Sequence, residues 1–399
     1  MKWKIFGGKW QKPKRWITIP LIVLLVIECL YLLFIYSSWA PIARLRSMAI
    51  QTSMSTMYHQ WIAKTFFPKS VVDSVMQPLE AARDEQVSLI SHWVITDPNI
   101  SAQASSEEDR FFAQFSELDR ASVTAYLTAH PEALNGGWGS ILIDKSALED
   151  EGTDMRTTEG DQVLAIDAAN GITLVRVQQN GWRGVLAIAH DPSRLSVQPS
   201  SLIQSGYGQT AGEIAKAHSG VLALTASGFM DENGVGSGGA ICGYAMCGGV
   251  VVSPAHCGYG YKRIELHEDN RLYILNVSSP VSSDCTDAVE FSPALIVDGK
   301  IVVDDTSVWT ALNPRACIGQ RSDGAILMFS VEGRQITSIG TTVVECAEVL
   351  ARYDCMQAIN LDGGTSAILW YRGKPVTRCC NLALPEGRTL PNAFVYAGS

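Results

Sequence analysis

The sequence predicts an α+β fold with mixed or antiparallel sheets and packed helices, preceded by one transmembrane helix. A 20-residue apolar run lies near the N-terminus, a helical region follows it, and from Asp161 onward short β-type runs are separated by turn signals. Helices and strands mix there without regular βαβ alternation, which disfavours a doubly wound sheet. Hydrophobic residues make up 47% of the 399 residues and charged residues 18%, so a packed core is expected.

The apolar run Ile17–Tyr36 is long enough to cross the ~30 Å hydrocarbon core of a membrane as a helix. Six basic residues precede it and only Arg44 and Arg46 follow closely, which places the N-terminus in the cytoplasm and the rest of the chain outside. A cleaved signal peptide is the rival interpretation, but Ser38-Trp39-Ala40 is a poor cleavage site. We therefore expect a single-pass anchor in the cell membrane. The predicted segments are a cytoplasmic basic tail at 1–16, the transmembrane helix at 17–36, a juxtamembrane helical region and linker at 37–160, and one domain at 161–399.

The charge distribution excludes one class of partner. Beyond the basic tail, 25 basic residues stand against 40 acidic ones, so a nucleic-acid partner is not expected. Glu28 inside the span is either a contact with another membrane helix or a protonated group that the long run tolerates.

The ten cysteines give no zinc-type spacing. Cys242 with Cys247, or Cys346 with Cys355, could close short loops, and Cys379-Cys380 is a vicinal pair. Nine cysteines lie outside the span, so at least one thiol is free or pairs with another chain.

The helical elements are predicted first along the chain. Residues 43–77 have a helical pattern with a break at Pro68, and His59 within them is expected to be packed or exposed rather than a metal ligand. Residues 100–109 have the composition of a linker, and 110–128 could form another helix. Further helices are predicted at 210–218, ended by Gly220, and at 342–353.

The strands follow from short alternating or β-branched runs bounded by turns such as Asn170-Gly171, Asn180-Gly181, Asp298-Gly299 and Arg372-Gly373. The predicted strands lie at 163–166, 172–177, 184–189, 221–225, 295–303 (a hairpin), 325–331, 358–361, 367–371 and 374–378.

The most distinctive local feature is Asn360-Leu361-Asp362-Gly363-Gly364-Thr365-Ser366, where a strand ends at a carboxylate, two glycines and two hydroxyls. Paired glycines let the backbone approach a ligand, and successive N–H groups in such a turn can bind an anion. Asp362 could then orient a sugar hydroxyl or act as nucleophile or base. The alternative is a plain hairpin turn without a ligand.

Two arginines are candidates for binding a phosphate. Arg315 precedes a strand-like stretch, and Arg388 lies near the C-terminus. A guanidinium group suits phosphate because it donates two parallel hydrogen bonds. A surface salt bridge is the alternative for Arg315. The glycine-rich stretch 228–239 lacks the Lys-Ser/Thr of a phosphate-binding P-loop.

Taken in order over residues 184–399, these clusters resemble the phosphodiester glycosidase family, which includes N-acetylglucosamine-1-phosphodiester α-N-acetylglucosaminidases and bacterial proteins linked to exopolysaccharide. The matching motifs are Gly228-Phe229-x-Asp231, Phe291-x-Pro293-x-Leu295, Pro314-Arg315-x-x-Ile318-Gly319-x-x-x-Asp323-Gly324, Asn360 to Gly364, and Pro391-Asn392-Ala393. The chain departs from the family at Thr225, where members usually have Asn, and at Ser292 and Thr365, where they usually have Gly.

The resemblance implies an extracytoplasmic hydrolase that cleaves a sugar from a sugar-1-phosphodiester, in cell-envelope or exopolysaccharide metabolism. It assigns Asp362 and Arg315 to catalysis, with Asp231, Asp323 or Glu290 as the second carboxylate that glycosidases usually carry. Substrate contacts are expected from Asn360, Gly363, Gly364, Thr365, Ser366, Gly228, Phe229, Asp231, Arg388 and Asn392.

The partners implied are a sugar phosphate or glycan, the membrane, and optionally other envelope proteins. No cofactor is assigned, although a divalent cation is left open. The alternative is a non-catalytic protein that binds glycan or acts as a scaffold in polysaccharide assembly. A protease or acyl hydrolase is disfavoured because no G-x-S-x-G or H-E-x-x-H motif is present.

Overall fold

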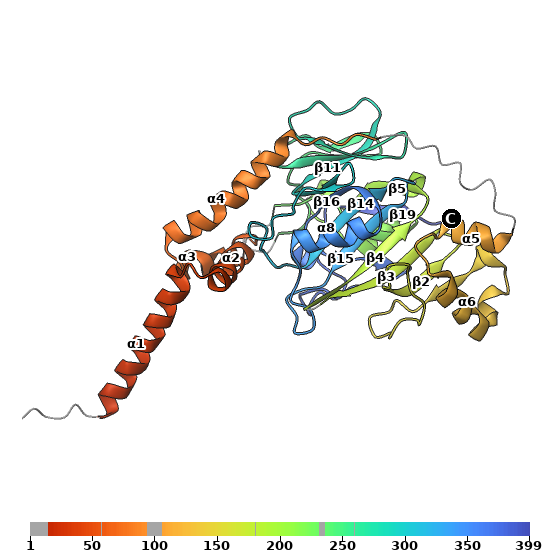
Figure 1. Ribbon diagram of the computed structural model, residues 1–399. Coiled ribbons are helices and arrows are strands. Elements are labelled where there is room, and N and C mark those ends of the chain that lie inside the picture. Colours follow the sequence, from red (N-terminus) through yellow and green to blue (C-terminus); the bar gives the residue numbers. More distant parts are fainter. Residues whose placement is uncertain (1–14, 57, 94–105, 180, 231–235, 259) are drawn as a thin grey trace, which may run out of the picture.

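The computed structural model describes residues 15–56, 58–93, 106–179, 181–230, 236–258 and 260–399. Figure 1 shows a long helix, α1 (Arg15–Tyr36), that extends away from the rest of the molecule and meets it through α2 (Ala40–Met54), α3 (Gln60–Phe66) and α4 (Lys69–Glu85). The prediction of helical structure with a break at Pro68 is confirmed, because Pro68 caps α4. A second break separates α2 from α3.

Helix α1 contains a stretch, Thr18–Tyr36, of 19 residues with mean hydropathy 2.6, of which 6% is buried. By length and composition this helix could cross a membrane, and a signal sequence would pass the same test. The C-terminal end of α1 is tied to the helices that follow. Arg46 of α2 donates hydrogen bonds to the carbonyl oxygens of Phe34 (3.1 Å) and Ser37 (2.9 Å).

The rest of the molecule contains three sheets in which every strand pair is antiparallel, which confirms the α+β prediction. The largest has nine strands in the order β1 (Leu142–Asp144), β2 (Gln162–Asp167), β3 (Ile172–Gln179), β4 (Trp182–Ala189), β15 (Ile326–Val331), β14 (Arg315–Arg321), β16 (Cys355–Asn360), β12 (Ala294–Val297) and β13 (Lys300–Ile301). The second contains β10 (Leu272–Asn276), β9 (Lys262–His267), β11 (Cys285–Phe291), β7 (Ala245–Cys247) and β8 (Val250–Ser253). The third contains β18 (Lys374–Pro375), β17 (Trp370–Tyr371), β6 (Gly220–Thr225), β19 (Asn392–Ala397) and β5 (Leu195–Pro199).

The predicted hairpin turns at Asp298-Gly299 and Arg372-Gly373 are confirmed, whereas Asn180 of a third lies outside the described residues. Asp298 and Gly299 have φ of 52° and 74°, and Arg372 and Gly373 have φ of 43° and 94°. Two successive residues at positive φ make the turn that matches the twist of paired strands.

The predicted helices at 210–218 and 342–353 are present as α7 (Ala211–Ala217) and α8 (Val343–Arg352). Each starts with a capping box, in which a threonine and a glutamate three residues later bond each other's backbone N–H. One detail was wrong: Gly220 does not stop α7 but begins β6, and the left-handed residue after the helix is Ser219, with φ of 54°.

The segment before residue 161 belongs partly to the largest sheet, because β1 pairs with β2. The predicted helix at 110–128 is two helices, α5 (Glu107–Gln114) and α6 (Arg120–Ala129), since Asp119 caps α6 by accepting a hydrogen bond from Ser122 N. Both helices bury apolar side chains against β2. Of the predicted linker, residues 100–105 lie outside the described residues, and residues 107–109 form the first turn of α5.

The core has two main layers. One face of the nine-stranded sheet packs against the two smaller sheets, through side chains such as Ile318 and Ile359 against Leu224 and Ile264. The other face packs against α8 (Figure 1). All ten cysteines lie within the described residues and are free thiols, so neither short loop is closed by a disulfide.

Candidate active site

A cavity of about 990 Å³ lies where β14 begins and β16 ends. These strands are antiparallel neighbours, with Cys317 opposite Asn360, so the first residue of one and the last residue of the other share one end of the sheet. Arg315 and Asp362 consequently line the same cavity. Of the site residues predicted from the sequence, nine line it: Phe229, Arg315, Asn360, Asp362, Gly363, Gly364, Thr365, Ser366 and Arg388.

The loop after β16 is not a hairpin turn, so the alternative of a plain hairpin is wrong. It carries the chain from the nine-stranded sheet, through a short 3-10 helix, η8 (Gly364–Ser366), to β17 in another sheet. Gly364 N donates to Pro314 O at 3.1 Å, and a Cβ on Gly363 would lie 2.5 Å from that same oxygen. Gly364 has φ of 64°. The two glycines therefore let the loop fold closely over the start of β14 and hold Asp362 at the cavity wall.

Four guanidinium groups line the cavity, from Arg83, Arg315, Arg334 and Arg388. Among the lining residues that the structure describes, Asp362 is the single acid. Burial lowers the pKa of Arg315, and the positive charges of Arg83 and Arg334 lower it further. So much positive charge against one carboxylate favours an anionic ligand.

Hydrogen bonds to the backbone hold Arg315, which donates from Nη2 to Ala311 O (2.8 Å) and from Nε to Thr341 O (3.3 Å). Arg388 lies 4.5 Å from the centre of the Phe229 ring and donates to Gly236 O at 3.3 Å. These contacts orient both side chains before any ligand binds.

Three lining residues carry a buried polar atom without a partner among the described residues: Arg83 (Nε), Asn360 and Ser366. Asn360 is 3% exposed and Ser366 is 2% exposed. The Asn360 side chain donates from Nδ2 to Ser292 O at 2.9 Å, which leaves its Oδ1 unpaired, and Ser366 Oγ also has no partner. Because an unpaired buried polar atom costs about 1–3 kcal/mol, such atoms on a cavity wall point to a ligand that pairs with them.

Two predicted residues within the described part of the chain, Gly228 and Asn392, do not line the cavity. An added Cβ on Gly228 would lie 3.0 Å from the ring of Phe291, which does line it. Asn392 is buried and bonds Ser227 through both side-chain atoms, at 2.9 Å and 3.0 Å, so it fixes the segment before Phe229 and belongs to the support of the site. Asp231 lies outside the described residues.

Two candidates for the second carboxylate were wrong. Glu290 is fully buried and bonds His256 Nδ1 (2.7 Å) and the backbone N–H groups of Tyr244 and Cys257 (3.1 and 2.6 Å). Asp323 pairs with Arg321 at 2.6 Å, at the end of β14 farthest from the cavity. Both carboxylates stabilise the fold, and sequence spacing gave no sign of this.

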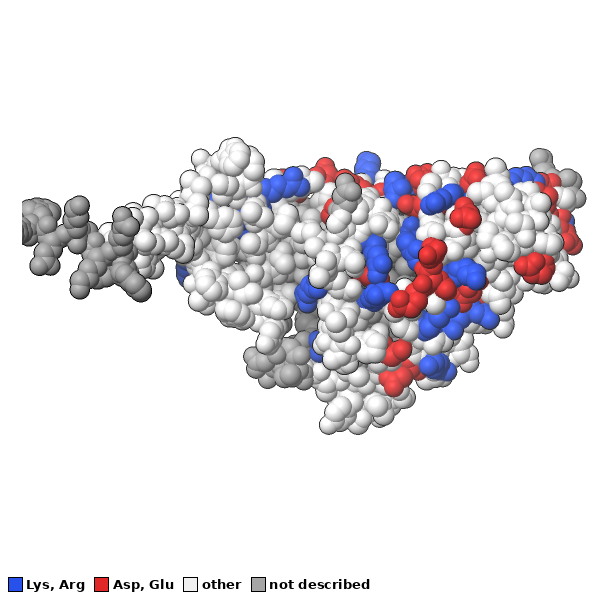
Figure 2. Space-filling view, turned by 90° about the horizontal axis from the view of Figure 1, so that it is seen from below, with Lys and Arg blue, Asp and Glu red and all other residues white. Residues whose placement is uncertain are grey.

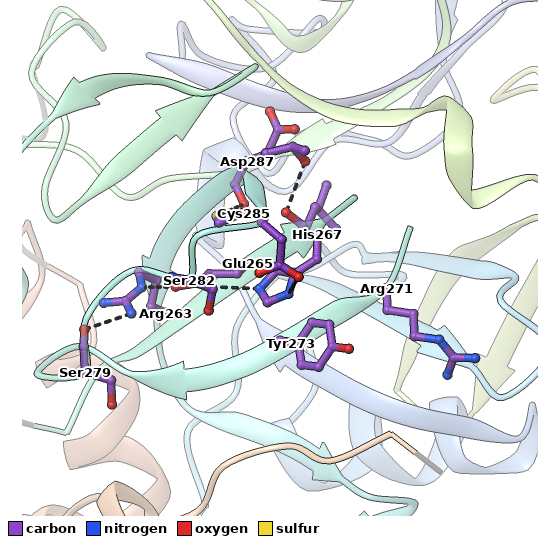
Figure 3. A network of polar contacts seen from close by, with 12 residues as sticks. Arg263, Glu265, His267, Arg271, Tyr273, Ser279, Ser282, Cys285 and Asp287 are labelled. Carbon is purple, nitrogen blue, oxygen red and sulfur yellow. Dashed lines mark hydrogen bonds and ion pairs between the residues drawn. The ribbon is translucent and has the colours of Figure 1, made fainter. Parts of the chain in front are cut away.

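The polar network in Figure 3 lies on the second sheet and contributes nothing to the cavity lining. Arg263 donates to Glu265 at 2.7 Å, His267 lies 2.8 Å from the other oxygen of Glu265, and the His267 ring stacks on Tyr273. Burial would raise the pKa of Glu265, but the hydrogen bonds from His267, Ser282 and Arg263 outweigh it and lower that pKa to about 2.

Sequence reasoning missed several cavity residues. Arg83 and Arg334 had no motif, and His59 was expected to be merely packed or exposed, although it lines the cavity. Burial, and then the charge of Arg334, lowers the pKa of His59. Cys380 of the vicinal pair also lines the cavity. Across the described residues, no group of three or more His, Cys, Asp or Glu side chains is placed to hold a metal ion.

Comparison with known proteins bears on this site. Residues 219–397 match the family model described as phosphodiester glycosidase. A SPbeta prophage-derived uncharacterized protein, YomE, of Bacillus subtilis (strain 168) is 28% identical over 193 residues, which is 45% of this chain and 29% of that protein. The chain thus spans less than a third of this relative's length.

Among solved structures, the catalytic domain of zebrafish N-acetylglucosamine-1-phosphodiester alpha-N-acetylglucosaminidase, auto-inhibited by its pro-peptide, matches with a TM-score of 0.47 and 17% identity, over 57% of this chain and 82% of that chain. A hypothetical protein from Synechocystis matches with a TM-score of 0.40 and 13% identity, over 60% and 65% of the two chains. The match to the family model spans residues 219–397, which include Arg315, Asp362 and Arg388, so this part of the chain is similar to the phosphodiester glycosidases.

Proposed function

We propose that this protein is a membrane-anchored, extracytoplasmic hydrolase that cleaves a sugar from a sugar-1-phosphodiester in cell-envelope or exopolysaccharide metabolism. The observation that carries the proposal is the cavity itself, in which Asp362 faces a site lined by four guanidinium groups. The match of residues 219–397 to the phosphodiester glycosidases supports this reaction class.

The reaction we propose breaks the bond between sugar C1 and the phosphate oxygen. The electron pair leaves with that oxygen, and the product is a phosphate monoester whose charge the guanidinium groups of Arg315 and Arg334 stabilise. A hydroxyl group from water bonds to C1, and Asp362 accepts the proton of that water or first stabilises the positive charge that develops on the sugar. The Asn360 side chain and Ser366 would bind sugar hydroxyls.

A single acid in the cavity lining fits this leaving group. Glycosidases usually need a second carboxyl group to protonate the departing oxygen. A phosphate monoester has a second pKa of about 6, so it can leave as an anion without that proton. Non-catalytic binding of a glycan phosphate is the second candidate function, and it is favoured by the same observation, because one carboxylate is also enough to orient a sugar that is never cleaved.

The test is to measure release of free sugar by the full-length protein in detergent. Asp362→Asn is expected to lower turnover at least ~100-fold, the lower range for a positioned acid or base, while the affinity for a sugar-1-phosphonate stays within a few fold. Asp354→Asn is the matched control, because exposed Asp354 precedes the other end of β16, and its φ of 57° suits asparagine. Binding of the phosphonate without any sugar release by the unchanged protein would favour the second function.

The anchor is proposed from the contacts of α1. The carbonyl oxygens of Phe34 and Ser37 at its end accept hydrogen bonds from Arg46, and Ile35 is buried. Cleavage of a signal peptide near Ala40 would remove these contacts. We therefore expect purified protein from membranes to retain its N-terminus, as intact-mass measurement would show.

A further inference from the structure

One wall of the cavity comes from outside the family match. Helices α2 and α4 and the turn between α2 and α3 contribute lining residues between Gln51 and Arg83, well before residue 219. Several of them are apolar: Met54, Tyr58, Met76 and Leu79. Further apolar side chains from later in the chain, such as Phe291 and Trp309, also line the cavity. A sugar phosphate is polar and would not contact these apolar side chains favourably. The lining therefore fits a ligand that also has an apolar part.

The apolar wall continues onto the surface of the molecule. Tyr58 lines the cavity and is also 65% exposed, and next to it Trp61 and Phe66 of α3 are 55% and 52% exposed. The rings of Trp61 and Phe66 lie 6.2 Å apart. Exposed neighbouring aromatic side chains of this kind mark an interaction surface.

Charge points to what this surface meets. Residues 29–72 contain Arg44, Arg46, Lys64 and Lys69 and no Asp or Glu. On the face drawn in Figure 2, the end of the molecule that carries α1 is almost without charged side chains, which gather over the opposite half. Aromatic rings with scattered basic residues and no acids are typical of segments that lie in the interface of a membrane with anionic lipids.

The position of α3 relative to the apolar helix α1 supports the same occupant. Tyr31 Oη of α1 donates to Phe66 O at 2.9 Å, and the rings of Phe34 and Phe67 lie 6.0 Å apart. Exposed Tyr36 and Trp39 lie at this end of α1, where aromatic rings prefer the membrane interface. The α3 surface is therefore continuous with the end of the predicted span.

We propose that α3 lies in the outer interface of the membrane and that the substrate is a lipid-linked sugar phosphate, which enters the cavity from the bilayer. Its apolar chain runs over Tyr58 and Met54, and its phosphate reaches Arg315 and Arg334 with the sugar at Asp362. The substrate part of this proposal rests on the proposed function, whereas the membrane contact of α3 does not.

The experiment uses the full-length protein in vesicles of phosphatidylcholine with phosphatidylglycerol. Two substrates carry the same group, N-acetylglucosamine-1-phosphate, esterified either to butanol or to a long isoprenoid alcohol that partitions into the vesicle. The variant is Trp61→Gln with Phe66→Gln, since neither side chain lines the cavity. The matched control is Leu142→Gln with Val250→Gln, which removes two exposed apolar side chains from β1 and β8.

We expect kcat/KM of the unchanged protein to be at least ~10-fold higher for the isoprenoid substrate than for the butyl substrate. The variant should lose this preference and the control should keep it. In both, kcat/KM for the butyl substrate should change less than ~2-fold. Equal kcat/KM for the two substrates, or an unaffected preference in the variant, overturns the proposal. A second measurement is independent of activity. Lipids brominated near the headgroup should quench the fluorescence of Trp61. The quenched fraction of the total tryptophan fluorescence should therefore be smaller in Trp61→Phe than in the unchanged protein.

The two readouts separate the proposals. If neither substrate is cleaved but the fluorescence of Trp61 is quenched, the result counts against the proposed function and the lipid-linked substrate, and it supports the membrane contact of α3. An unquenched Trp61 overturns the inference whatever the activity.

Discussion

Replacing Ser366 by alanine is expected to make the free protein more stable and its ligand binding weaker. Ser366 Oγ is buried on the cavity wall without a partner among the described residues. An unpaired buried hydroxyl costs about 1–3 kcal/mol, so its removal should stabilise the fold by about 1 kcal/mol after allowing for the small void. That is about 2–4 °C in the melting temperature for a domain of this size. A ligand that pairs with this hydroxyl would lose about 1 kcal/mol, or roughly 5-fold in affinity.

Ser330→Ala is the matched control for this experiment. Ser330 is equally buried, but its Oγ donates to Ala367 O at 3.1 Å and lies 3.2 Å from Thr377 Oγ1. The control should lower the melting temperature and leave the affinity unchanged. Differential scanning calorimetry and titration with a sugar-1-phosphonate measure the two quantities. Destabilisation of Ser366→Ala to the same extent as Ser330→Ala would refute the reasoning, because the hydroxyl would then have a partner in the free protein.

Three further predictions concern pH, a thiol and the glycine loop. Glu265 has a pKa of about 2 in the folded protein against an ordinary 4.5, so its ionised form contributes about 3 kcal/mol to the free energy of unfolding above pH 4.5. This contribution is lost as the pH falls toward 2. The free energy of unfolding of Glu265→Gln should therefore depend less on pH between 4.5 and 2. The hydrogen bond with the Cys379 thiol, and then the charge of Arg334, lower the pKa of Cys380 to about 7 against the effect of burial. The rate of Cys380 alkylation by iodoacetamide, measured by peptide mass spectrometry, should therefore have a midpoint near pH 7. This midpoint should rise in Arg334→Gln. An unchanged midpoint would exclude that charge effect. Gly363→Ala should lower the free energy of unfolding in urea by about 1–3 kcal/mol, because the new Cβ would meet Pro314 O. Gly139→Ala is the control, because open space surrounds Gly139, and it should not have this effect. Equal effects of the two substitutions would contradict the contact.

The parts of the fold that were predictable are those encoded within a few residues. The turns at Asp298-Gly299 and Arg372-Gly373, and the start of α8 at Thr342, each depend on neighbours in the chain, and each is present. The nine-stranded order was not predictable, because β4 pairs with β15 across more than a hundred residues of intervening chain. Side-chain alternation gives the face of a strand but not its partner.

The same division applies to the site. Asp362 and Arg315 were found because each adjoins a strand end in a motif, and the register of β14 with β16 brings them to one cavity. Arg83 was missed because a helix pattern does not tell which distant loop its last turn will face. Glu290 was wrongly considered as a second catalytic carboxylate, because the sequence does not distinguish a carboxylate that contacts a substrate from one that accepts hydrogen bonds from buried N–H groups.

The split origin of the cavity has a consequence for how specificity could diversify. Arg315 and Asp362 come from one part of the chain, and apolar side chains of the wall come from α2 and α4, more than two hundred residues earlier. If the proposed function holds, exchange of the first 93 residues between relatives would change the entrance of the cavity while leaving Arg315 and Asp362 in place. Chimeras joined within 94–105 would reveal whether recognition and chemistry are inherited separately.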